Sequence, residues 1–247
     1  MKALPLFVGI GCMAATPLSP SFGAEPVRGP KAMPIVVFGD STTAPRDTVK
    51  IYADLLKEEL PPKGLAVDIS NAGVGGNSTL DAKARFQKDV VARRPALVVI
   101  QFGINDSTIN VWKKPPESRP PVSKSQFAAH LEYFIDTLHR QHCKVILMTP
   151  NPMRWTPALK NLYGKAPYLP NDPDGFNVTL RAYAECVRTV AKKKKVSLVD
   201  VYAEFQNYGK QHPLDDLLLD GMHPNDQGHR MVADLLIAEI VRITGSK

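Results

Sequence analysis

Five short apolar segments alternate with amphipathic segments along most of this chain, and that rhythm limits the fold more than any other feature. The apolar segments are PIVVF (34–38), LAVDIS (65–70), ALVVIQF (96–102), KVILMT (144–149) and SLVDVY (197–202). Helical periodicity marks residues 49–60, 79–94, 125–142, 177–195 and 225–243. Regular alternation of strands and helices favours a parallel sheet with helices on both faces and right-handed crossovers. We therefore predict a three-layer α/β/α sandwich around a five-stranded parallel sheet.

The first two dozen residues differ from the rest of the chain. A lysine is followed by the apolar stretch LPLFVGIGCMAA, and small residues stand at Ser21 and Gly23. This pattern is typical of an export signal, and the apolar stretch is too short to span a bilayer. We predict a cleaved signal peptide over residues 1–23 and a secreted or periplasmic protein. A lipoprotein signal at Cys12 is the weaker alternative, because Gly9 stands where such signals have leucine.

Residues 24–247 predict a single domain. The 247 residues are 44% hydrophobic and 22% charged, which is enough for one sizeable core. The lysine run 192–195 ends a predicted helix, where positive charge complements the helix dipole, so we expect no nucleic-acid partner. No segment of this part of the chain is long and apolar enough to predict a membrane span. Cys143 and Cys186 permit either one disulfide or two free thiols, and the oligomeric state is left open.

Polar and glycine-rich residues follow several of the predicted strands. They are Gly39-Asp40-Ser41, NAGVGGNST (71–79), GIND (103–106) and, further beyond the fifth strand, DGMHP (220–224). Ligands of open α/β sheets bind beyond the carboxyl ends of the strands. All four groups are therefore expected at one edge of the sheet, where they can form a single site.

One histidine is placed to activate a serine. A nucleophilic serine needs a base within hydrogen-bond reach and an acid that orients the base. His223 lies in a loop that enters a helix, with Asp220 three residues before it, whereas the other five histidines lie in helices or in a distant loop. A carboxylate at this spacing can reach the imidazole and free its other nitrogen for Ser41. The same spacing also occurs where an aspartate only caps its own loop.

An oxyanion site is predicted from the two middle groups. The backbone N–H groups of a glycine-rich turn such as Gly73, Gly75 and Gly76 can point at one spot, and the Asn105 side chain can add a further donor. Each residue also has an ordinary interpretation, because glycines form turns and asparagines cap their own backbone.

Together these groups resemble the four sequence blocks of the SGNH, or GDSL, hydrolases. The matching residues are GDS at 39–41, Asn-Ala-Gly-Val-Gly-Gly at 71–76, Gly-x-Asn-Asp at 103–106 and Asp-x-x-His at 220–223. Thr42 replaces the leucine of the family name, and GDSTTA is similar to the first block of the rhamnogalacturonan acetylesterase branch.

The resemblance implies a flavodoxin-like strand order and a serine esterase without a metal or other cofactor. It implies Ser41 as nucleophile, His223 as base and Asp220 as orienting acid. It implies an oxyanion hole made by the N–H groups of Ser41 and Gly76 and by the Asn105 side chain, with Gly75 as the neighbouring alternative. We interpret Asp40 and Asp106 as residues that fix their loops.

Candidate substrate residues lie in two segments after the third and fourth strands. Trp112 and Trp155 are the only tryptophans, and the segment 149–177 is long and rich in proline and aromatic residues. Flat aromatic side chains suit sugar rings, and Arg154 or Lys113 can pair with a uronate carboxylate. The alternative is that the aromatic residues only hold an irregular loop together, a role equally open to Tyr163 and Tyr168.

The expected function is hydrolysis of a short acyl ester, with acetyl on carbohydrate as the favoured substrate. A lipase, acyl-thioesterase or lysophospholipase of the same family is the alternative. A metallophosphoesterase and a non-catalytic carbohydrate-binding protein are the remaining classes.

Overall fold

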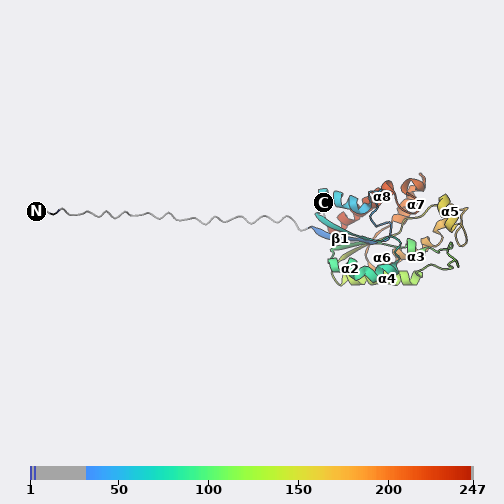
Figure 1. Ribbon diagram of the computed structural model, residues 1–247, viewed down its shortest axis with the longest axis horizontal. Coiled ribbons are helices and arrows are strands. Elements are labelled where there is room, and N and C mark those ends of the chain that lie inside the picture. Colours follow the sequence, from blue (N-terminus) through green and yellow to red (C-terminus); the bar gives the residue numbers. More distant parts are fainter. Residues whose placement is uncertain (2, 4–31, 246–247) are drawn as a thin grey trace. The chain divides into compact units, whose positions relative to one another are not determined.

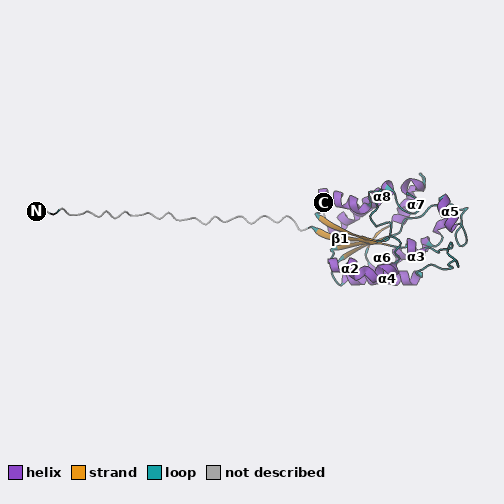
Figure 2. Cartoon of the chain, in the orientation of Figure 1, coloured by secondary structure: helices purple, strands orange, loops and turns teal. Residues whose placement is uncertain are grey.

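The computed structural model describes Met1, Ala3 and residues 32–245. The predicted signal peptide, residues 1–23, otherwise lies outside the described residues, and so does the possible lipoprotein cysteine. The strands are β1 (Met33–Gly39), β2 (Val67–Gly73), β3 (Leu97–Gln101), β4 (Lys144–Met148) and β5 (Ser197–Val199). They form one parallel sheet in the order β2-β1-β3-β4-β5. Figures 1 and 2 show this sheet between helices, which confirms the predicted fold class.

Helices cover both faces of the sheet (Figure 1). The helices are α1 (Tyr52–Glu59), α2 (Thr79–Asp89), α3 (Ile104–Ser107), α4 (Lys124–His139), α5 (Pro157–Tyr163), α6 (Leu180–Lys194), α7 (Val201–Tyr208) and α8 (Asp226–Thr244). Alternate residues of a strand point to opposite faces. Ile35 and Val37 of β1 therefore pack with residues of α1, α7 and α8, whereas Val36 and Phe38 pack with residues of α2, α4 and α6.

A third apolar cluster lies beyond the sheet and supports the long loops. Its buried members include Ile104, Met153, Tyr168, Phe176 and Leu180. Helices α3 and α5, which the periodicity did not predict, lie at this end of the molecule (Figure 1).

The last predicted strand is shorter than the sequence indicates. SLVDVY was expected to be extended to residue 202, but β5 ends at Val199 and Val201 begins α7. The reason is local, because Asp200 caps the helix by accepting a hydrogen bond from the N–H of Ala203.

Cys143 and Cys186 are free thiols. Among the described residues, no helix has the length and apolar character needed to cross a bilayer.

The strand register brings the polar loops to one level. Gly39 at the end of β1 lies opposite Gly73 of β2 and Gln101 of β3. The loops that follow these residues carry Ser41, Gly76 and Asn105. The parallel sheet thus places the three groups at a common edge.

Candidate active site

Ser41 lies in a tight turn directly after β1. The N–H groups of Thr43 and Ala44 both donate to the carbonyl oxygen of Asp40, at 3.1 and 3.0 Å. Gly39 permits the turn, since a Cβ at that position would lie 2.1 Å from the Thr43 hydroxyl oxygen. The end of a buried strand therefore presents a partly exposed serine.

Ser41, His223 and Asp220 form one chain of hydrogen bonds. The Nε2 atom of His223 lies 2.9 Å from Ser41 Oγ, and its Nδ1 atom lies 2.7 Å from Asp220 Oδ2. Asp220 Oδ1 accepts from the backbone N–H groups of Met222 and His223, at 3.0 and 2.8 Å. Partial burial opposes ionisation of Asp220, but the hydrogen bonds from His223 outweigh it and hold the pKa of this carboxyl well below its usual range. The carboxylate can therefore orient the imidazole.

The loop that carries His223 is fixed on both sides. Its Leu219 N–H donates to the His223 carbonyl oxygen at 2.8 Å, and Asn151 after β4 donates to the Met222 carbonyl oxygen at 2.9 Å. Gly221 has a φ of +84°, and a Cβ there would lie 2.6 Å from the Arg154 carbonyl oxygen. Only glycine combines this backbone conformation with this close approach.

Gly76 and Asn105 border one pocket, and Gly75 lies close to Ser41. Gly76 has a φ of +75°, whereas a Cβ on Gly75 would lie 3.9 Å from the Ser41 Cβ. The Asn105 Nδ2 atom donates to the Asn77 carbonyl oxygen at 3.0 Å, which links the two loops. An amide nitrogen carries two hydrogens, so a second donor of Asn105 is available to a substrate. The choice between Gly75 and Gly76 as oxyanion donor stays a prediction.

Arg85 of α2 ties these loops together, and sequence reasoning missed it. Its guanidinium donates to the carbonyl oxygens of Gly39 and Ala72, at 3.0 and 2.7 Å, and to Asn77 Oδ1 at 2.7 Å. The same group lies 4.7 Å from the centre of the Phe38 ring. An arginine within a helical pattern usually belongs to a solvated face, so the sequence held no signal for this role.

A buried polar network lies next to Ser41. Asp40 is 1% exposed, and its Oδ1 atom accepts from the N–H of Thr42 at 2.9 Å. The Thr42 hydroxyl lies within hydrogen-bond distance of both Asp40 and Gln101, contacts that a leucine could not make. Burial raises the pKa of Asp40, against the hydrogen bonds from Thr42. Thr42, which stands where the family name has leucine, therefore helps to hold this turn.

Asp106 is the second buried carboxyl near the site. Its Oδ1 atom accepts from the N–H of Thr79, the first residue of α2, at 2.8 Å, and its Oδ2 atom has no hydrogen-bond partner. Burial raises the pKa of Asp106 to about 7. Both aspartates bind residues of their own or neighbouring loops, in keeping with the loop-fixing interpretation.

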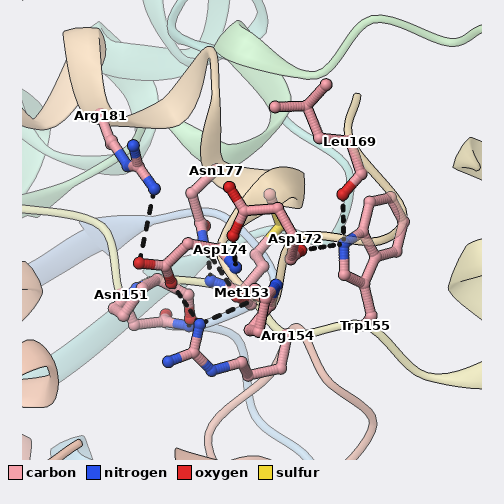
Figure 3. Close-up of polar contacts among 11 residues, drawn as sticks. Asn151, Met153, Arg154, Trp155, Leu169, Asp172, Asp174, Asn177 and Arg181 are labelled. Carbon is pink, nitrogen blue, oxygen red and sulfur yellow. Dashed lines mark hydrogen bonds and ion pairs between the residues drawn. The ribbon is translucent and has the colours of Figure 1, made fainter. Parts of the chain in front are cut away.

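The two tryptophans lie in different settings. Trp155 stacks on Phe176 with ring centres 4.6 Å apart. Its Nε1 atom lies 3.0 Å from the carbonyl oxygen of Asp172 and 3.3 Å from that of Leu169 (Figure 3). Arg154 forms an ion pair with Asp174 (Figure 3). Both side chains contact other residues of the 149–177 segment, and their role in substrate binding stays a prediction.

Trp112, by contrast, is 47% exposed and lines the pocket that Gly76 and Asn105 border. Lys113 and Tyr163 also line this pocket, whereas Tyr168 is buried in the third apolar cluster.

Within residues 32–245, no three histidine, cysteine or acidic side chains are grouped so that they could hold a metal ion.

Comparison with known proteins adds independent information. A family model described as "GDSL-like Lipase/Acylhydrolase family" matches residues 37–231. The "uncharacterized lipoprotein YqeF" of Bacillus subtilis is 32% identical over 216 residues, which cover 80% of this chain and 85% of that protein. An acetylxylan esterase of Geobacillus stearothermophilus is 29% identical over 195 residues, which cover 78% of this chain and 80% of that protein. The crystal structure of an acetyl xylan esterase superposes with a TM-score of 0.66 and 27% identity, covering 84% of this chain and all of that one.

Proposed function

The chain belongs to the GDSL-like lipase/acylhydrolase family, and from that premise we propose that it is a serine esterase that removes acetyl and other short acyl groups from carbohydrate. The observation that carries the proposal is the chain of hydrogen bonds from Ser41 through His223 to Asp220. This arrangement supplies a nucleophile, a base and an orienting acid.

In the proposed reaction, Ser41 Oγ attacks the ester carbonyl carbon while His223 Nε2 takes the hydroxyl proton. The oxyanion of the tetrahedral intermediate accepts hydrogen bonds from the N–H groups of Ser41 and Gly76 and from the Asn105 side chain. His223 then gives its proton to the departing alcohol oxygen, and the C–O bond breaks. Water attacks the acyl-enzyme with His223 again as base, which releases the acid and restores Ser41.

Two observations favour a carbohydrate ester over a lipid. Two relatives named above are acetylxylan esterases, and the pocket beside Asn105 carries polar side chains such as Ser78, Thr108 and Asn110. A long acyl chain would displace water from these polar groups and offer them no hydrogen bonds in return, which is unfavourable.

Release of acetate from a panel of acetylated polysaccharides tests the proposal, alongside nitrophenyl esters of rising acyl length. We expect acetate release and a rate that falls as the acyl chain lengthens. A rate that rises with chain length, without acetate release, would instead identify a lipase, thioesterase or lysophospholipase.

The two remaining classes have their own tests. A non-catalytic carbohydrate-binding protein would leave Ser41 unlabelled by a fluorophosphonate probe while still binding sugar. A metallophosphoesterase would lose its activity on dialysis against a chelator.

We also propose that the protein is exported. The support is the pattern of residues 1–23 and the similarity to a protein named as a lipoprotein. The mass of the mature protein from fractionated cells tests this. A chain that begins near residue 24 supports cleavage, a lipid-modified chain that begins at Cys12 supports a membrane anchor, and a full-length chain overturns the proposal.

A further inference from the structure

A pocket of about 360 Å³ opens beside the proposed oxyanion hole. Gly76, Asn105 and Met222 are among its lining residues, and Met222 directly precedes the proposed base His223. Trp112 in the segment after α3 and Tyr163 at the end of α5 also line it. A group attached to the ester carbon at Ser41 therefore has a defined space to enter.

The size and lining of this pocket point to the alcohol part of the ester. Its volume lies in the range of small-molecule sites. It far exceeds the volume of the methyl group of an acetyl ester, a group similar in size to a water molecule, which takes about 30 Å³. A long acyl chain fits it poorly, because half of the lining residues are polar or charged. These are Ser78, Asp81, Asn105, Thr108, Asn110 and Lys113.

Trp112 gives the pocket a flat apolar surface, and polar groups stand beside it. The indole is 47% exposed although tryptophan is among the most hydrophobic side chains. The nearby Asn110 Nδ2 donates to Glu117 Oε2 at 2.8 Å, which fixes the amide. A flat apolar face with fixed hydrogen-bonding groups matches a pyranose ring, which has an apolar face and a polar rim.

The charges around the pocket disfavour an acidic sugar. Lys113 Nζ lies 2.6 Å from Oε1 of Glu117, a residue outside the pocket lining, so a carboxylate already pairs with this lysine at the solvent-exposed rim, and the hydrogen bond from Lys113 lowers the pKa of Glu117. Asp81 adds a negative charge, because the hydrogen bond from the Ser78 hydroxyl lowers the pKa of Asp81. A uronate carboxylate would meet no unpaired cation among these side chains and would be repelled by Asp81.

We propose that this pocket binds the alcohol part of the substrate as a neutral pyranose stacked on Trp112, and that the ion pair between Lys113 and Glu117 selects against acidic sugars. The proposal rests on the proposed function, because it concerns the same ester.

Trp112→Ala, with Trp112→Phe as a conservative variant, tests the stacking. Two esters are compared, an acetylated xylo-oligosaccharide and ethyl acetate, whose alcohol is too small to reach the indole. Trp112→Ala is expected to lower kcat/KM on the sugar ester about tenfold more than on ethyl acetate, which corresponds to roughly 1.4 kcal/mol of lost binding in the transition state. Trp112→Phe is expected to recover most of the loss, because it keeps a flat ring. His139→Ala, on the exposed end of α4, serves as the surface control.

Glu117→Gln tests the charge selection, because it frees Lys113 without removing a pocket-lining side chain. The ratio of kcat/KM for acetylated oligogalacturonide to that for acetylated xylo-oligosaccharide is expected to rise about fivefold. The double variant Glu117→Gln, Lys113→Met is expected to return the ratio towards that of the wild type.

The outcomes separate the two proposals. Equal losses on both esters in Trp112→Ala, or an unchanged ratio in Glu117→Gln, overturn the pocket proposal while the esterase stands. A wild-type protein that hydrolyses neither ester overturns the proposed function and the pocket with it.

Discussion

The Nε2 atom of His223 lies 2.9 Å from Ser41 Oγ, although 182 positions separate the two residues in the chain. Ser41 follows the strand β1, and His223 lies in the loop before α8. The contact therefore depends on how the sheet and the last helix are packed.

Ser41→Ala and His223→Ala are each expected to lower kcat by on the order of 10³-fold or more, because each removes a group that forms or breaks a bond. The measurement is hydrolysis of an aryl acetate, with circular dichroism to show that the fold is kept. Near-normal turnover by Ser41→Ala would show that the mechanism is wrong.

Asp220→Asn is expected to lower kcat by about 10²-fold or more, close to the effect of Asp220→Ala. Asparagine keeps an oxygen for the N–H groups of Met222 and His223, but its amide N–H₂ replaces the oxygen that faces His223 Nδ1. The imidazole then no longer has a carboxylate to stabilise its protonated form. If Asp220→Asn kept wild-type kcat, Asp220 would only be a loop cap.

Arg85→Lys is expected to lower kcat about tenfold or more, with a smaller change in KM, because a lysine cannot hold Gly39, Ala72 and Asn77 at once. The rate of labelling of Ser41 by a fluorophosphonate should fall in parallel, since it reports the same oxyanion geometry. Arg93→Lys, on the exposed turn after α2, is the matched control. A loss of thermal stability with unchanged kcat and labelling rate would show that Arg85 is structural only.

Asp106→Asn is expected to remove part of the pH dependence of folding stability. The pKa of Asp106 is raised from its ordinary value to about 7 by burial, so between about pH 4 and pH 7 the folded protein binds a proton that the unfolded chain has lost. The contribution of this group to the free energy of unfolding therefore falls as pH rises through that window, by at most about 1.4 kcal/mol per pH unit.

Urea unfolding at several pH values measures this effect. The stability of Asp106→Asn relative to the wild type should increase from pH 4 to about pH 7 and then level off. Asp40, which is also buried, is present in both proteins, and its negative charge adds to the effect of burial on the pKa of Asp106. Parallel profiles for the two proteins would contradict the raised pKa.

The periodicity of the chain was sufficient to predict the five strands and the helices on both faces. The signal was clearest for β3 and β4, because burial on both sides leaves continuous apolar runs. It failed where a local contact overrode the pattern, as at Asp200, whose side chain starts α7 within a segment that looked extended. It also missed α3 and α5, which are too short to show a helical period.

The chemical groups at the ends of the strands can be identified without a structure, since they occur within short blocks around Ser41, Asn105 and His223. Which of these side chains meet depends on how the chain folds in three dimensions. Trp112 and Trp155 look alike in the sequence, yet one lies exposed in the pocket and the other is stacked on Phe176. Arg85 likewise became visible only when its helix packed against three loops. The physical reason is that a catalytic block is a local pattern, whereas burial and pairing depend on residues far away in the chain.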